Sequence, residues 1–250
     1  MAILDRNLAR TALVLWLGMG AACGDDSDDT NMNVGGNEQA ADAYYVGAAS
    51  MALGASTNEA DCALCHSDDG TQERLPGKTF KDVAYKESWK GGDAPTLLAA
   101  ANACVTGWMG GTALSEEDPE WKSLEAYLQS LSDEGASEPN AIMPEVLADE
   151  AAYEEAYADG DAAAGEAKFN DACGACHGTQ LTVGMRPAWA LDALKAQSVG
   201  RIAQKVRTSG PPPSGTDDAM DSTPGPMPFF EPGDLASDDL RDIIAYIKQN

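Results

Sequence analysis

The spacing of apolar residues predicts a chain built from helices that are joined by irregular segments. Near the C-terminus, Leu240, Ile243, Ile244 and Ile247 fall on one face of a helix capped by Ser237, a residue type that favours helix starts. Similar spacing or alanine-rich composition predicts earlier helices. Their approximate ranges are residues 40–60, 94–104, 119–132, 141–160, 161–169, 191–194 and 199–206. Aromatic residues make up only 6 % of the chain, which favours an all-α fold over a sheet sandwich.

Glycine- and proline-rich stretches divide this helical pattern. Residues 107–111 are expected to form a tight loop, and residues 209–228 contain six prolines, which exclude regular structure. Residues 133–140 mark a boundary, and residues 141–160 are compatible with either half. The expected divisions are a signal peptide at 1–22, a disordered acidic tether at 23–40, a first domain at 41–135, a linker or bridging helix at 136–160 and a second domain at 161–250.

The first 22 residues have the features of an export signal. Arg6 and Arg10 precede a short apolar run at residues 11–20, and small residues follow it. This run is shorter than the roughly 20 apolar residues that a membrane-spanning helix needs. Cleavage would leave Cys23 at the N-terminus, so the segment resembles a bacterial lipoprotein signal, with an ordinary cleaved signal peptide as the alternative. Both interpretations predict export to the periplasmic side of a bacterial membrane, either lipid-anchored through Cys23 or soluble or secreted.

Two short motifs carry the candidate chemistry. They are Cys62-Ala63-Leu64-Cys65-His66 and Cys173-Gly174-Ala175-Cys176-His177. In a Cys-x-x-Cys-His motif, each thiol can add to one vinyl group of a porphyrin, while the imidazole reaches the iron. A single Cys-x-x-Cys pair would also fit a zinc knuckle or a thioredoxin-like redox site. Two copies, each followed directly by histidine, favour two covalently attached haem c groups.

An internal repeat surrounds the two motifs. Pro76 and Pro187 each follow the motif histidine by ten residues. A methionine in a constrained loop comes next, Met109 in the first half and Met227 in the second, and each is followed by an amphipathic helix. The recurrence of motif, proline, methionine and helix in the same order predicts two similar domains.

Each half resembles a class I cytochrome c domain, and residues 41–250 resemble a dihaem c-type cytochrome made of two such domains. The second half is the closer match, through residues 165–177, through Met227-Pro228-Phe229 and through residues 235–240. The resemblance implies that the methionine loop supplies the sixth iron ligand. It also implies that a proline backbone carbonyl, from Pro76 or Pro187, accepts a hydrogen bond from the proximal histidine and orients its ring.

The histidine count limits how the iron atoms can be held. The chain has only two histidines, His66 and His177, so a haem with two histidine ligands would need a second chain. The sixth position must therefore hold methionine, lysine, cysteine, a terminal amine, solvent or nothing, and a methionine thioether gives a centre suited to one-electron transfer. The preferred ligands are Met109 and Met227. The alternatives are Cys104 at the first haem, as in thiolate-ligated haems of sulfur-oxidising cytochromes, and Met220 or Met185 at the second.

The net charge of −25 limits the partners of the protein. It excludes nucleic-acid binding through a broad basic surface, and it is compatible either with solubility alone or with an acidic docking surface for a basic redox partner. The leading hypothesis is a periplasmic electron carrier between an exported dehydrogenase or quinol oxidase and a downstream acceptor or small carrier. The alternatives are a haem enzyme that oxidises a sulfur compound or reduces peroxide at an unusual first haem, and an accessory subunit of a larger complex.

Overall fold

The computed structural model describes residues 42–71, 73–208 and 227–250. All of these residues belong to one compact unit of the chain. The predicted signal peptide, the lipidation site Cys23 and the acidic tether lie outside the described residues, as do Met220 and nearly all of the proline-rich segment. No described helix is both long enough and apolar enough to cross a membrane.

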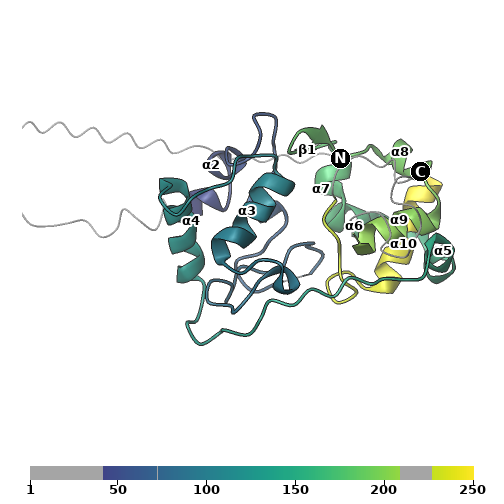
Figure 1. Ribbon diagram of the computed structural model, residues 1–250. Coiled ribbons are helices and arrows are strands. Elements are labelled where there is room, and N and C mark those ends of the chain that lie inside the picture. The colour runs from purple at the N-terminus through teal and green to yellow at the C-terminus, as the bar shows by residue number, and fades with distance from the viewer. Residues whose placement is uncertain (1–41, 72, 209–226) are drawn as a thin grey trace, which may run out of the picture. The chain divides into compact units, whose positions relative to one another are not determined.

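Short helices and irregular segments make up the first half (Figure 1). Its elements are η2 (Asp42–Tyr44), α2 (Ala48–Met51), η3 (Cys62–Leu64), η4 (Lys90–Gly92), α3 (Leu97–Gly107) and α4 (Pro119–Ser130). The prediction of one helix over residues 40–60 is wrong, because the chain turns at Gly47, whose φ is 88°. The side chain of Asn58 then bonds the carbonyls of Met51 and Ala60, which replaces helical hydrogen bonds in that stretch.

The two longer helices of the first half begin near the predicted residues. α3 starts after Thr96, whose hydroxyl accepts a hydrogen bond from the Ala99 amide at 3.0 Å, and it runs to Gly107, further than predicted. α4 starts at Pro119, which needs no backbone amide partner at that position. The two helices contribute to an apolar core. Its buried members are Val83, Trp89, Ala94, Trp121, Leu124, Tyr127 and Leu128.

The segment that joins the two halves is extended for most of its length. It bonds the first half at Glu87, whose amide donates to Ser137, and at Gly91, whose amide donates to Asn140. The predicted bridging helix over residues 141–160 is therefore wrong in extent. Only α5 (Glu150–Tyr157) is helical, and it begins where Asp149 accepts a hydrogen bond from the Ala152 amide.

The core contacts of α5 place this helix with the second half. Tyr153 and Tyr157 are fully buried beside Ile202 and Val206 of α9 (Val199–Thr208). A carboxylate oxygen of Glu154 also accepts a hydrogen bond from the Gly200 amide, at the start of α9. The structure thus assigns α5 to the second half, whereas the sequence is compatible with either half.

In the described part of the second half, one small hairpin and four further helices accompany α5 and α9. They are α6 (Ala162–Ala172), α7 (Gly174–His177), β1 (Thr182–Val183), β2 (Arg186–Pro187), α8 (Leu191–Lys195) and α10 (Ser237–Gln249). The short helix α7 was not predicted, whereas the other helices correspond to predicted ones, with Ala236 and not Ser237 at the N-cap of α10. The hairpin was not predicted, because two-residue strands leave almost no alternation of polar and apolar residues in the sequence.

The crossing of α6 and α10 forms the centre of the second half. The Phe169 and Tyr246 rings lie 5.4 Å apart at this crossing, and the Lys168 ammonium lies 2.6 Å from carboxylate oxygens of both Asp239 and Asp242. The apolar side of α10 is buried, as its spacing predicts. This crossing positions the end of α6, where the second Cys-x-x-Cys-His motif begins.

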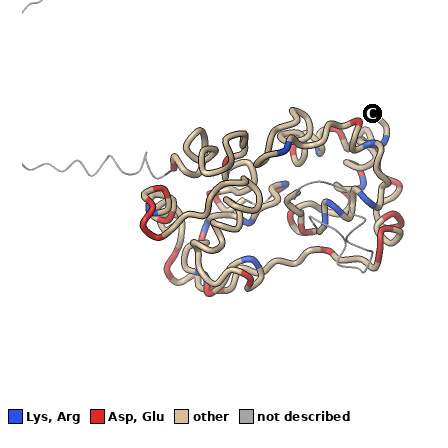
Figure 2. Tube along the Cα trace, turned by 45° about the horizontal axis from the view of Figure 1, so that its top comes forward, with Lys and Arg blue, Asp and Glu red and all other residues tan. Residues whose placement is uncertain are grey.

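Acidic residues occupy exposed positions on both halves (Figure 2). Glu116 and Glu117 are exposed before α4, and Glu150, Glu154 and Glu155 are exposed along α5. Exposed carboxylates of this kind make the negative charge of the chain available to a partner.

Candidate functional site

Two largely apolar cavities lie next to the two Cys-x-x-Cys-His motifs. The cavity of the second half has a volume of about 520 Å³, and that of the first half has about 260 Å³. Each is lined by the predicted residues of its own half. The second cavity receives Cys173, Cys176, His177, Pro187 and Met227, and the first receives Cys62, Cys65, His66, Pro76 and Met109. Residues up to 54 positions apart in the sequence are thus brought together as predicted.

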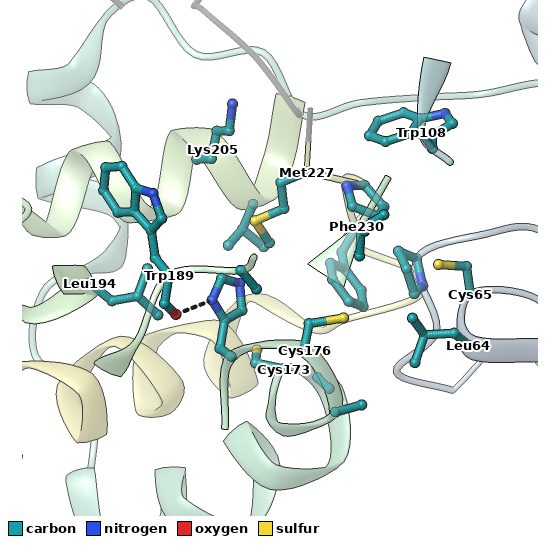
Figure 3. A pocket seen from close by; sticks show the side chains of 18 of the residues that line it. Leu64, Cys65, Trp108, Cys173, Cys176, Trp189, Leu194, Lys205, Met227 and Phe230 are labelled. Carbon is teal, nitrogen blue, oxygen red and sulfur yellow. Dashed lines mark hydrogen bonds between the residues drawn. The ribbon is translucent and has the colours of Figure 1, made fainter. Parts of the chain in front are cut away.

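The His177 ring is oriented by a backbone carbonyl. Its Nδ1 atom lies 2.8 Å from the carbonyl oxygen of Trp189, the bond drawn as a dashed line in Figure 3. Because a carbonyl can only accept, Nδ1 carries the proton and Nε2 keeps a free lone pair. Burial lowers the pKa of His177, which keeps the imidazole neutral. The ring is therefore prepared to bind a metal ion through Nε2.

The same arrangement recurs at His66 in the first half. Its Nδ1 atom donates to the carbonyl oxygen of Lys78 at 2.7 Å, and burial again lowers the pKa of the ring. The Phe80 ring stacks on this imidazole with 4.5 Å between centroids. The Tyr45 hydroxyl donates to the His66 carbonyl at 2.8 Å. Two separate parts of the chain thus hold their histidines in the same tautomer.

The carbonyls that accept these bonds differ from those expected. Lys78 and Trp189 each lie two residues beyond the proline, so the assignment of the acceptor carbonyls to Pro76 and Pro187 is wrong. In the first half, the chain turns back at Gly77, whose amide donates to the Cys65 carbonyl at 2.8 Å, and this turn brings the later carbonyl to the histidine. Both prolines still line the cavities.

Replacing Gly77 by alanine is expected to disturb the first site. A Cβ atom at this position would overlap the Cε1 and Nδ1 atoms of His66 and lie 2.7 Å from the Cys65 carbonyl oxygen. Overpacking of this kind costs about 1–3 kcal/mol, so thermal unfolding should move to lower temperature. Gly233→Ala is the control, because a Cβ there meets no atom within 4 Å. Equal melting temperatures for the two variants would contradict this account of Gly77.

The thiols of the motifs are not in the state that thioredoxin-like redox chemistry needs. Burial raises the pKa of Cys62 to about 11 and that of Cys65 and Cys173 to about 12. Reactive cysteines have a lowered pKa instead. Across residues 42–71, 73–208 and 227–250, no three His, Cys, Asp or Glu side chains are placed to hold a metal ion together. The raised pKa values disfavour the thioredoxin-like interpretation.

Met227 is the described methionine best placed for the second site. Its side chain is half-buried and extends into the cavity, in which Figure 3 also shows Cys173 and Cys176. Met185 lines the rim of the same cavity but is 74 % exposed. Met220 lies outside the described residues.

Met109 occupies the corresponding place in the first half. It is 6 % exposed, and its backbone is held on both sides, since its amide donates to the Cys104 carbonyl at 3.0 Å and its carbonyl accepts from the Ala55 amide at 2.8 Å. Cys104 lines the same cavity and has no disulfide partner among the described residues. Both candidates for the sixth ligand of the first haem are therefore brought to one place.

Basic residues that line the cavities were missed by sequence reasoning. Arg201 and Lys205 of α9 line the second cavity, and Lys90 lines the first. A porphyrin with two propionate groups needs cations near otherwise apolar walls, because a buried carboxylate is costly without a partner. The spacing of four residues between Arg201 and Lys205, on one face of a predicted helix, was the available signal.

The residues present fit a covalently bound haem in both halves. Each cavity combines apolar walls, two thiols, a neutral imidazole with a free Nε2 lone pair, a thioether and nearby basic residues. The second cavity, at about 520 Å³, has a volume typical of cofactor sites, and the first, at about 260 Å³, lies just below that range.

Comparison with known proteins identifies the second half. Residues 160–247 match the family described as "Cytochrome C oxidase, cbb3-type, subunit III". This range contains the second Cys-x-x-Cys-His motif, Met227 and the crossing of α6 and α10. The comparison with curated proteins gave no match. Residues 160–247 are thus a c-type cytochrome domain, and this domain implies covalently bound haem c.

Proposed function

We propose that the protein is a periplasmic dihaem cytochrome c that carries single electrons between redox partners through two haems, each held by histidine and methionine. The observation that carries the proposal is the repetition of the site. In both halves, the histidine of the motif bonds the carbonyl twelve residues later, and a methionine lines the same cavity. A geometry identified as a cytochrome c domain in one half supports the same function in the other.

The chain prepares each site for electron transfer and not for substrate chemistry. Haem c, when bound, supplies a one-electron couple whose potential depends on the axial ligands and on burial. The backbone carbonyls of Lys78 and Trp189 hold His66 and His177 in one tautomer and one orientation, so little movement accompanies a change of charge. The walls of both cavities are largely apolar, which favours a buried cofactor.

Met109 is proposed as the sixth ligand of the first haem in preference to Cys104. Burial raises the pKa of the Cys104 thiol, which keeps it protonated. A thiol binds iron well only as the thiolate. A methionine thioether needs no deprotonation, and Met109 is held by two backbone hydrogen bonds. The alternative of a thiolate-ligated haem enzyme is therefore the less favoured one.

The proximity of the two motifs supports electron exchange within the chain. Cys65 of the first half lines the same cavity as Cys176 of the second, as Figure 3 shows. The Cys176 thiol also contributes, after burial, to the raised pKa of Cys65, which requires the two sulfur atoms to be near each other. Covalent attachment at these thiols would bring the attached edges of both cofactors to this shared region.

The proposed partners are redox proteins. The exposed carboxylates on both halves favour a basic partner surface, with association that weakens as salt concentration rises. The matched family is described as a subunit of a cytochrome c oxidase, which favours an acceptor of that class or a place within a larger complex. Export through residues 1–22 and a lipid anchor at Cys23 would hold the protein at the periplasmic membrane surface.

Absorption and electron paramagnetic resonance spectra of the purified protein test this function. Two low-spin ferric haems, and ferrous haems that bind CO slowly, are expected, because both sixth positions are filled by methionine. High-spin ferric signals together with ready binding of cyanide or CO at both sites would refute the proposal. Turnover with thiosulfate or peroxide that disappears in Cys104→Ala would favour the enzyme alternative instead.

A further inference from the structure

A short hairpin of the second half reaches the methionine loop of the first. β1 and β2 pair antiparallel, with Val183 opposite Arg186, and the turn between them begins at Gly184. Gly184 has a φ of 67°, a conformation that residues with a Cβ rarely adopt. The hairpin lies between His177 and the Trp189 carbonyl that orients the His177 ring. In the sequence, the hairpin therefore belongs to the segment that forms the second site.

Four hydrogen bonds attach this hairpin to residues 57–59 of the first half. The Thr182 amide donates to a Glu59 carboxylate oxygen at 2.7 Å, and the Glu59 amide donates to the Thr182 carbonyl at 2.8 Å. The Gly184 amide donates to Oδ1 of Asn58 at 2.9 Å, and the Thr57 hydroxyl donates to the Gly184 carbonyl at 2.9 Å. The backbone groups of Thr182 and Gly184 are thus all satisfied by the other half.

The Asn58 side chain, which accepts the hydrogen bond from the Gly184 amide, is itself held by other hydrogen bonds. It is 8 % exposed, and its amide nitrogen donates to the carbonyls of Met51 at 3.0 Å and Ala60 at 2.7 Å. Its Oδ1 atom accepts from the Gly184 amide at 2.9 Å and also from the Ala60 amide at 3.4 Å, so every polar atom of the side chain is used. Asn58 therefore presents a rigid acceptor and holds the hairpin in one place.

The same glycine rests on the backbone that carries Met109. A Cβ at Gly184 would lie 2.6 Å from the Trp108 carbonyl oxygen and 3.3 Å from the Met109 carbonyl carbon. On its other side, this loop is held by the hydrogen bond from the Ala55 amide to the Met109 carbonyl. The loop is consequently enclosed between residues of its own half and the hairpin of the other half.

We propose that the β1–β2 hairpin positions Met109 as the axial ligand of the first haem, with Gly184 as the positioning residue. The inference rests on the proposed function, in which Met109 completes the first site. It adds that the sixth ligand of one haem depends on the segment that orients the proximal histidine of the other. Displacement of the hairpin would release Met109 while leaving Met227 in place.

Gly184→Ala in the full chain with both haems attached is the principal test. In the reduced protein, the methyl group of a methionine on haem iron gives a proton resonance shifted far upfield by the porphyrin ring. Two such resonances are expected in the parent, assigned by their loss in Met109→Ala and Met227→Ala. In Gly184→Ala the Met109 resonance should disappear, the Met227 resonance should remain, and CO should bind the first haem at least about tenfold faster.

Thr57→Val provides a milder variant should Gly184→Ala fail to fold. It keeps the side-chain shape and removes only the hydrogen bond to the Gly184 carbonyl. A roughly fivefold faster CO reaction at the first haem is expected, the effect of one hydrogen bond of ordinary strength. Gly233→Ala adds the same methyl group to the second half in open space and should match the parent.

The outcomes separate this inference from the function on which it rests. A parent protein without an upfield Met109 resonance would overturn the proposed ligand, and with it the inference. A parent with both resonances, and a Gly184→Ala or Thr57→Val variant that keeps the Met109 resonance and the parent rate of CO binding, would overturn the inference alone.

Discussion

Replacing Cys62 and Cys65 together by alanine is expected to leave one covalently bound haem, where the proposed function gives the parent two. The two thiols line the cavity of the first half beside His66, and the second site keeps its own thiols. Without thiols, the first haem would depend on axial ligands and apolar contacts alone and would be lost on denaturation. The mass of the denatured protein and the ratio of haem to protein measure the result, and both should show a loss of half the haem.

The reciprocal variant is the matched control for this experiment. Replacing Cys173 and Cys176 by alanine should also leave one haem, this time in the first half. Cys104→Ala should retain both, because Cys104 lies outside the two motifs. A Cys62 and Cys65 double variant with the same haem content as the parent would show that only the domain at residues 160–247 carries haem.

Met227→Ala is expected to convert the second haem into a centre that binds CO readily and has a lower reduction potential. The thioether is the only methionine sulfur of the described residues that is half-buried in the second cavity. Axial ligands shift haem potentials over roughly 0.8 V. Loss of the Met227 thioether is therefore expected to lower the reduction potential of the second haem by an amount on the order of 100 mV. A potentiometric titration followed by visible absorption measures it, and the first haem should keep its own potential.

Two further variants separate the candidate ligands. Met109→Ala should produce the same change at the first haem and leave the second unchanged. Met185→Ala should alter neither potential by more than a small amount, since this side chain is 74 % exposed. A Met227→Ala protein that keeps the parent potential and does not bind CO would assign the second ligand to another residue, with Met220 as the first to test.

The candidate residues that the two cavities bring together are those that local spacing in the sequence points to. A motif of five residues places two thiols and an imidazole together whatever the rest of the fold does. The methionines were found because the sequence repeats the same order of features in both halves. The helices α4, α6 and α10 were found because their apolar spacing, Pro119 or alanine content is readable within one element.

The errors share a different cause. The predicted helix over residues 40–60 fails because Asn58 and Gly47 impose turns that alanine content does not reveal. The assignment of the acceptor carbonyls to the prolines came from the family resemblance. It fails in the first half because the turn at Gly77, held by a hydrogen bond to the Cys65 carbonyl, brings the Lys78 carbonyl to His66 instead. In each case a hydrogen bond between separate residues overrode a local preference.

The sequence by itself determined the candidate chemistry of this protein: the two Cys-x-x-Cys-His motifs, the shortage of histidines that favours methionine as the sixth ligand, and the helical elements around them. Only the tertiary structure decided that α5 packs in the second half, that Lys78 and Trp189 orient the histidines, and that Gly184 rests on the loop of Met109. The physical reason is the separation in sequence between the residues that interact. Thiols and imidazoles act through their own atoms, whereas the contact between Asn58 and Gly184 joins residues 126 positions apart and exists only after both halves have packed.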